Sequence, residues 1–112
     1  MAVAQDMHRF GHHLIVGISG TKLNDEDKRI LSEIKPAGII FYAKNFRYGV
    51  HYEEWLQLYQ DLVNQIRQYA ERNSMLITID HEGGTVHRPY LPITRFPHAF
   101  LLQSWAREVA KA

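Results

Sequence analysis

The stretch Met75-Leu-Ile-Thr-Ile79 decides how this chain folds, because it is short, continuous and apolar and is followed at once by Asp80. Apolar runs of about four to eight residues between turn-forming residues are typical of β-strands that are buried on both faces. Two upstream stretches have the same character, His13-Leu-Ile-Val-Gly-Ile18 and Gly38-Ile-Ile-Phe-Tyr42. Three such strands without an alternating polar face predict a parallel sheet that is covered by helices.

Amphipathic helices separate these strands. A first helix is predicted between Asn24, a suitable N-cap, and Pro36, which disfavours helical geometry at the residue before it. A second helix is predicted from about His51 to Arg72, because apolar residues recur there at steps of three and four. The broken stretch from His81 to Pro97 predicts a long loop, and a last helical pattern runs from Phe100 to Ala112.

This order of strands and helices defines the α/β class. Two parallel architectures fit it: a small open doubly wound sheet, and the first three β/α units of a (β/α)8 TIM-type barrel. A whole barrel needs about 250 residues, whereas this chain has 112 and ends inside a helical pattern. We therefore expect residues 1–112 to form part of such a barrel, with a parallel sheet flanked by helices.

Composition excludes several classes of protein. Thirteen Lys and Arg against twelve Asp and Glu give a net charge of +1, so neither a nucleic acid nor a membrane surface is an expected partner. The absence of cysteine excludes disulfides, thiolate metal sites and a cysteine nucleophile. No apolar run approaches the roughly 18 residues of a membrane span, and the first residues lack the features of a signal peptide. We expect a single soluble, cytoplasmic domain.

Candidate binding residues follow the third strand. Ligands of parallel α/β folds meet the loops at the carboxyl ends of the strands, and Asp80 stands at the end of this one. A carboxylate accepts hydrogen bonds from paired sugar hydroxyls, and Arg88 offers the complementary fork of donors. Glu82 follows two positions after Asp80, where it contacts the ligand or braces the loop through the backbone or Arg88. Gly83 and Gly84 allow positive φ angles or close approach of the backbone to a ligand.

The stretch Asp80-His-Glu-Gly-Gly-Thr-Val-His-Arg88 resembles the D-x-E-G-G-R-V-x-R signature of glycoside hydrolase family 3, in its bacterial β-N-acetylhexosaminidase branch. Two more segments are similar to that branch in the same order. Gly38-Ile-Ile-Phe-Tyr-Ala-Lys-Asn-Phe46 is similar to its G-x-I-L-F-x-R-N segment, and Thr94-Arg-Phe-Pro97 to its T-x-F-P stretch. Thr85 and Lys44 depart from the pattern, because each stands where the family usually has arginine.

The resemblance implies a barrel enzyme that removes a terminal β-linked N-acetylglucosamine from cell-wall-type oligosaccharides by a retaining mechanism. It implies that Asp80 binds hydroxyls of the terminal sugar and is not the nucleophile. Arg88 and Glu82 are the further candidate substrate-binding residues. The nucleophilic aspartate and the acid/base histidine lie in later segments that do not occur in these 112 residues. No residue here is therefore expected to be catalytic, and the chain alone is expected to be inactive. His81 and His87 occupy variable positions, to which the resemblance gives no role.

No metal or other cofactor is expected. Neighbouring residues of an extended chain point to opposite sides, and the histidines of the Asp80–His87 stretch do not form a pair spaced by four. Two loop residues at the same sheet edge, Arg47 and Tyr48, are interpreted as solvated, with lining of the cleft as the alternative. An incomplete barrel would also expose an apolar strand face, which predicts self-association.

Two alternatives stay open. One is a non-catalytic α/β module that stands alone and binds carbohydrate or another partner. The other is a doubly wound phosphate-binding domain, for which Gly17-Ile-Ser-Gly20 is a short match to the expected glycine-rich turn.

Overall fold

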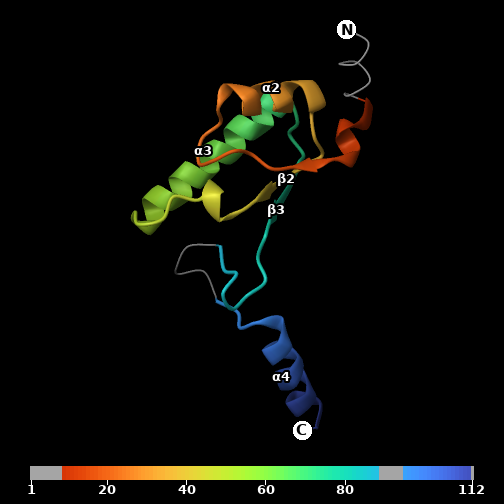
Figure 1. Cartoon of the computed structure of the whole chain (residues 1–112), viewed down its shortest axis with the longest axis vertical. Helices are drawn as coiled ribbons and strands as arrows, with labels where there is room; N and C mark the ends of the chain where they lie inside the picture. The colour runs from red at the N-terminus through yellow and green to blue at the C-terminus, as the bar shows by residue number, and fades with distance from the viewer. Residues whose placement is uncertain (1–8, 89–94, 112) are drawn as a thin grey trace.

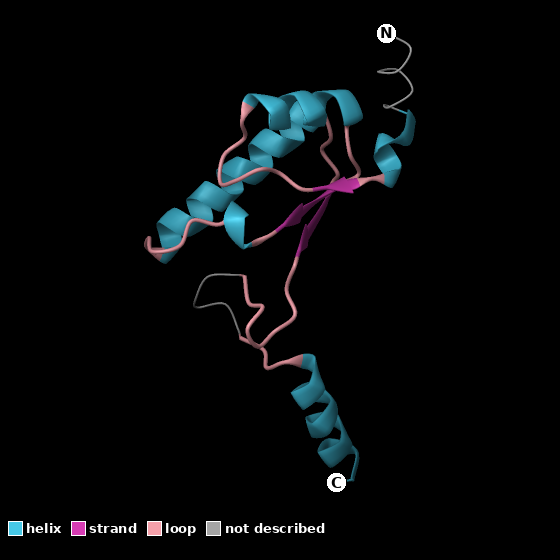
Figure 2. Ribbon diagram, in the orientation of Figure 1, coloured by secondary structure: helices cyan, strands magenta, loops and turns pink. Residues whose placement is uncertain are grey.

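The chain folds around a three-stranded parallel sheet, seen edge-on near the middle of the molecule (Figures 1 and 2). The structure is a computed structural model and describes residues 9–88 and 95–111. The strands are β1 (Ile15–Val16), β2 (Gly38–Phe41) and β3 (Leu76–Ile79), in the order β1-β2-β3. Both pairs of neighbours are parallel, so the predicted α/β class with a parallel sheet and helices is confirmed.

Helix α2 (Asp25–Ile34) joins β1 to β2 and begins where the sequence predicts. The Asn24 side chain accepts a hydrogen bond from the Asp27 backbone N–H, and the Asp27 carboxylate accepts one from the backbone N–H of Asn24. This reciprocal capping box satisfies donors that a helix start leaves open. The helix ends at Lys35, which has a left-handed φ of 48° directly before Pro36.

Helix α3 (Tyr52–Ala70) joins β2 to β3 and confirms the second predicted helix to within two residues at each end. Short 3-10 turns, η1 (Gly11–His13) and η2 (Ala43–Asn45), precede β1 and follow β2. Helices α2 and α3 lie together on one side of the sheet (Figure 2). The core between helices and sheet contains Ile18, Leu23, Leu31, Ile39, Phe41, Phe46, Trp55, Leu62, Val63, Ile66 and Ala70.

The expectation that the strands are buried on both faces is wrong. Side chains alternate along a strand, and the face that carries Ile39 and Phe41 is buried under the helices. The opposite face carries Ile15 and Leu76, which are 49% and 59% exposed. In the described residues, helices cover only one face of the sheet, so the second face stays open.

The first strand is also shorter than predicted. The backbone N–H of Leu14 donates to the Gly11 carbonyl, which folds the start of the expected strand into the turn η1. Gly11 itself lies against α2, because a Cβ there would stand 1.7 Å from the carbonyl oxygen of Ile34. Packing against the end of α2 therefore replaces strand pairing before Ile15.

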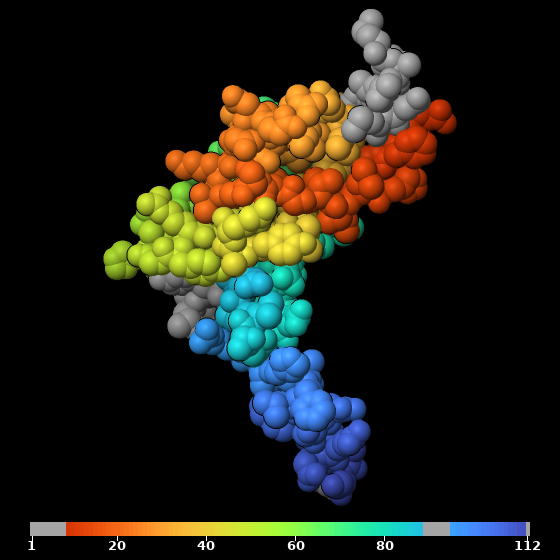
Figure 3. All heavy atoms as spheres, viewed as in Figure 1, coloured from red at the N-terminus to blue at the C-terminus, as the bar shows by residue number. Residues whose placement is uncertain are grey.

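Helix α4 (Ala99–Lys111) confirms the last predicted helix within the described residues. It projects away from the sheet and the other helices (Figures 1 and 3), and none of its residues is buried. Its exposed apolar side chains are Phe100, Leu101, Leu102, Trp105 and Val109. None of the helices in the described part of the chain combines the length and apolarity that crossing a membrane requires.

Candidate functional site

Asp80 lies at the carboxyl end of β3, as the sequence predicts. Its backbone N–H donates to the Phe41 carbonyl at 2.9 Å, which continues the pairing of β2 and β3 by one residue. By strand alternation Asp80 shares a face with Leu76 and Thr78, which is the face that no helix covers. Its side chain is 32% exposed. The carboxylate therefore stands at the open side of the sheet edge where ligands of parallel folds bind.

Arg88 returns to Asp80 and contacts it twice. Nη2 of Arg88 lies 3.2 Å from Oδ2 of Asp80, and Nε donates to the Asp80 backbone carbonyl at 3.2 Å. The Arg88 side chain is 24% exposed, so the pair is partly shielded from water. A guanidinium held at two points keeps a fixed plane. Asp80 and Arg88, the two residues whose chemistry suits sugar hydroxyls, are thus in contact, and we call this pair the clamp.

The loop between them turns back through two glycines. Gly83 and Gly84 have φ angles of 78° and 58°, which side chains rarely tolerate. A short antiparallel bridge closes the turn, with hydrogen bonds between Gly83 and Val86 in both directions. A Cβ on Gly83 would stand 2.5 Å from the Pro97 carbonyl oxygen. Glycine is therefore required here both for the backbone angle and for the close packing of the loop.

Two side chains hold the backbone of Arg88. The hydroxyl of Tyr48 donates to the Arg88 carbonyl at 2.9 Å, and the Arg88 N–H donates to Nδ1 of His81 at 3.3 Å. Tyr48 is 48% exposed, in agreement with its interpretation as a solvated loop residue, but its hydroxyl also contacts the loop that carries Arg88. Burial raises the pKa of the Tyr48 phenol, although the charge of Arg88 opposes this shift. The position of Tyr48 after β2, at the same sheet edge as Asp80, was the available signal.

His87 packs against His81 with ring centroids 4.7 Å apart and the planes at 65°. Both ring nitrogens of His87 are shielded from solvent and have no hydrogen-bond partner among the described residues. Burial lowers the pKa of His87, and the neighbouring His81 and Arg95 lower it further. His87 therefore favours its neutral form.

Glu82 is not brought to the clamp. Its side chain is exposed, and within the described residues its carboxylate accepts no hydrogen bond, from Arg88 or from any backbone group. Only its backbone N–H is engaged, by the Val86 carbonyl at 3.0 Å. The hypothesis that the Glu82 carboxylate braces the loop is therefore wrong. Thr85 is exposed in the turn, and Thr94, from the third matching segment, lies outside the described residues.

Asn45 is a structural residue that sequence reasoning did not single out. It is 4% exposed, and its Nδ2 donates to the carbonyls of Ile18 and Gly20 at 3.2 and 2.9 Å. Its Oδ1 accepts from the Tyr42 N–H at 2.8 Å. These bonds join the loops after β1 and β2, which explains an asparagine at this point of the matching segment. The adjacent Lys44 is exposed and makes no ion pair with another described residue.

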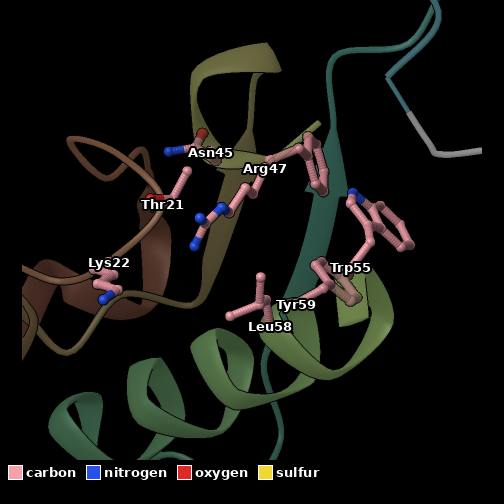
Figure 4. A pocket seen from close by; sticks show the side chains of 8 residues that line it. Thr21, Lys22, Asn45, Arg47, Trp55, Leu58 and Tyr59 are labelled. Carbon is pink, nitrogen blue, oxygen red and sulfur yellow. The ribbon is translucent and has the colours of Figure 1, made fainter. Parts of the chain in front are cut away.

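A small hollow lies beside these loops, on the side that the helices cover (Figure 4). It has room for about 20 Å³, which is close to one water molecule. Its lining comprises Thr21, Lys22, Asn45, Phe46, Arg47, Trp55, Leu58 and Tyr59. Neither Asp80 nor Arg88 lines it, so it is separate from the clamp. Among residues 9–88 and 95–111 no three His, Asp or Glu side chains gather as a metal site.

Comparisons with known proteins agree with the motif. No family model matches the chain. A β-hexosaminidase of Psychromonas ingrahamii is 38% identical over 86 residues, which are 77% of this chain and 23% of that protein. The β-hexosaminidase of Alkalilimnicola ehrlichii is 31% identical over 100 residues, which are 88% of this chain and 26% of the relative.

Solved structures share the fold. NagZ of Neisseria gonorrhoeae, in complex with N-trifluoroacetyl-D-glucosamine, has a TM-score of 0.63 at 30% identity over 88% of this chain and 26% of its own. A glycoside hydrolase family 3 β-N-acetylglucosaminidase of Paenibacillus sp. has a TM-score of 0.62 at 23% identity, over 82% of this chain and 17% of its own.

In sequence the chain is similar to bacterial β-hexosaminidases, and it spans about a quarter of the length of those relatives. In fold it is also similar to the glycoside hydrolase family 3 enzyme of Paenibacillus.

Proposed function

We propose that this chain supplies one side of the terminal-sugar subsite of a β-N-acetylhexosaminidase. The observation that carries the proposal is the Asp80–Arg88 pair on the open side of the sheet edge. Arg88 contacts only one oxygen of the carboxylate, Oδ2. The second oxygen is left to accept hydrogen bonds from sugar hydroxyls, and the remaining guanidinium N–H groups can donate to sugar oxygens. Glu82, exposed in the same loop, stays a candidate contact further along the substrate.

The substrate that we propose is a terminal N-acetylglucosamine of cell-wall-type oligosaccharides. The family resemblance supports it, as does the N-acetylglucosamine analogue bound by the gonococcal NagZ. In a retaining mechanism one group attacks the anomeric carbon, and a second protonates the leaving oxygen and later activates water. The role proposed for this chain is to bind and orient the sugar. The nucleophile and the acid/base group belong to segments that its 112 residues do not contain.

We also propose that the three strands are the first three of a (β/α)8 barrel. The open face of the sheet would then face the barrel interior. Exposed Ile15 and Leu76 support this arrangement, because aliphatic strand residues fill the interior of such barrels. In isolation the same face and helix α4 favour contact between copies of the chain. A cytoplasmic location stays a prediction, which cell fractionation would test.

The binding role is tested by NMR titration of the labelled chain with N-acetylglucosamine. Resonances of Asp80 and Arg88 should shift, and Asp80→Asn should abolish the shift because an amide cannot accept two hydrogen bonds through both atoms. Asp61→Asn is the matched control, since Asp61 is an exposed residue of α3 that accepts a hydrogen bond from Gln57. Binding that survives Asp80→Asn unchanged would refute the role of Asp80.

Activity is tested separately with a chromogenic β-N-acetylglucosaminide. The purified chain should give no turnover. Hydrolysis that Asp80→Ala abolishes would show that these residues contain catalytic groups, and would contradict the proposed division of roles. The stand-alone binding module would share the binding result. It differs in predicting a monomer that unfolds cooperatively, which sedimentation and thermal melting can detect.

A further inference from the structure

Arg88 is held by its backbone as well as by its side chain. A side chain accepts its N–H, and another donates to its carbonyl: Nδ1 of His81 at 3.3 Å and the hydroxyl of Tyr48 at 2.9 Å. Backbone groups in loops are more often bound by other backbone groups or by water. Two side-chain contacts on one residue therefore fix where the Arg88 side chain starts, before its guanidinium reaches Asp80.

The two holding residues come from different parts of the chain. His81 belongs to the same loop as Arg88, seven positions earlier, whereas Tyr48 lies forty positions earlier in the loop between η2 and α3. Tyr48 in turn packs its ring 6.4 Å from that of Phe46, which belongs to the core. Arg88 is therefore held in place by a contact that leads to the core as well as by contacts within its own loop.

The orientation of His81 is itself constrained. Its ring packs against that of His87 in a T-shaped arrangement, with the ring centroids 4.7 Å apart, and the nitrogens of His87 are shielded from solvent. Because Nδ1 of His81 accepts a hydrogen bond, the ring proton of neutral His81 must lie on Nε2. The ring pair thus keeps an acceptor, and not a donor, pointed at the Arg88 N–H.

We propose that Tyr48 and His81 are positioning residues of the sugar subsite, which hold Arg88 in the geometry that pairs it with Asp80. This inference rests on the proposed function, because it concerns the same subsite. The proposed role does not require either residue to touch the sugar. Each acts through Arg88, and together they set the distance between the guanidinium and the free carboxylate oxygen that the sugar meets.

The test uses the labelled full chain and two readouts, the Nε–H resonance of Arg88 and the affinity for N-acetylglucosamine. Tyr48→Phe and His81→Phe keep the rings but remove the hydrogen-bonding groups. Each should move the Arg88 Nε–H resonance toward that of free arginine and weaken binding about threefold to tenfold, as expected for one lost hydrogen bond. His81→Asn should retain wild-type values, because its side-chain oxygen can take the place of Nδ1.

Matched controls are Tyr69→Phe on α3 and His13→Phe in η1, which make the same atomic changes away from the loop. Both should leave the two readouts unchanged. The proposal is overturned if His81→Phe and Tyr48→Phe keep wild-type resonances, or if His81→Asn loses as much as His81→Phe. The proposed function fails in a different way, namely when Asp80→Asn does not alter sugar affinity, and the Arg88 resonance still tests the positioning role in that case.

Discussion

The guanidinium of Arg88 grips Asp80 at two points, the carboxylate Oδ2 and the backbone carbonyl. The seven residues between Asp80 and Arg88 form a single tight turn of the chain. The carboxylate and the cation therefore form one unit at the end of β3, and the chemistry of this edge depends on both.

Arg88→Lys is expected to weaken N-acetylglucosamine binding about threefold to thirtyfold, because lysine retains the charge but cannot form the two directed contacts of the guanidinium. The free energy of unfolding should change little, since the pair is partly exposed. Titration calorimetry or NMR measures the affinity, and urea denaturation the stability. Equal affinity in the two proteins would show that charge alone is sufficient at this position.

Gly83→Ala is expected to distort the signature loop. The substitution places a side chain at a φ of 78° and brings its Cβ to 2.5 Å from the Pro97 carbonyl. Gly49→Ala is an informative control, because Gly49 has a φ of 81° but no atom within 4 Å of its would-be Cβ. The control should cost about 1–2 kcal/mol from backbone strain alone. Gly83→Ala should cost more, and it should shift the amide resonances of Asp80 and Arg88.

Asn45→Ala should destabilise the fold by about 2–4 kcal/mol. It leaves the carbonyls of Ile18 and Gly20 and the N–H of Tyr42 without their partner in a buried setting. Asn64→Ala on the exposed side of α3 serves as the control and should lie within about 0.5 kcal/mol of the wild type. Urea denaturation gives both values. Similar stabilities for the two variants would show that water replaces the Asn45 amide.

His87 should make stability depend on pH. Its pKa in the folded chain lies below its ordinary value of 6.5, chiefly because of burial. The unfolded chain therefore takes up a proton first as the pH falls, and stability declines from about pH 6.5 downward through the lowered pKa. His87→Gln should flatten this decline, whereas His13→Gln in η1 should not. Urea denaturation at about pH 7.5 and about pH 5.5 compares them, and a parallel decline of all three proteins would contradict the prediction.

The exposed apolar stripe of α4 predicts association of the isolated chain that depends on concentration. Trp105→Glu should reduce this association, while Arg107→Glu on the same helix changes charge without removing an apolar group. Analytical ultracentrifugation over a range of concentrations measures the effect. A monomer at every concentration would contradict the prediction and favour the stand-alone module.

The helices, and the order of strands and helices along the chain, could be predicted because their signals are local. Asn24 and Pro36 mark the ends of α2 within the sequence itself, and the apolar steps from Tyr52 onward define α3. Burial of the strands could not be predicted in the same way. Whether Leu76 is covered depends on which other segments pack on its face of the sheet. A run of apolar residues looks the same in the sequence whether one face or both faces of the strand are buried.

In the candidate site too, contacts between residues close in sequence could be predicted, and contacts between distant segments could not. Asp80 and Arg88 are close in sequence, so the glycines between them already indicate that the chain returns on itself. Tyr48 lies in another loop, and its contact with Arg88 arises only when β2 and β3 pair in register. For Glu82 the sequence suggested that the carboxylate braces the loop, whereas the turn leaves the side chain exposed.

At the corner between β1 and α2, the hydrogen bonds to the Asp27 carboxylate all come from near neighbours. The Asp27 carboxylate accepts hydrogen bonds from the hydroxyl and backbone N–H of Ser19 and from the backbone N–H of Asn24, and none of these residues is more than eight positions from it. Contacts of such short range form quickly, since little chain entropy is lost in bringing them together. We therefore expect this corner to take shape early, even on a nascent polypeptide still leaving the ribosome, and to offer β2 a preformed edge to join.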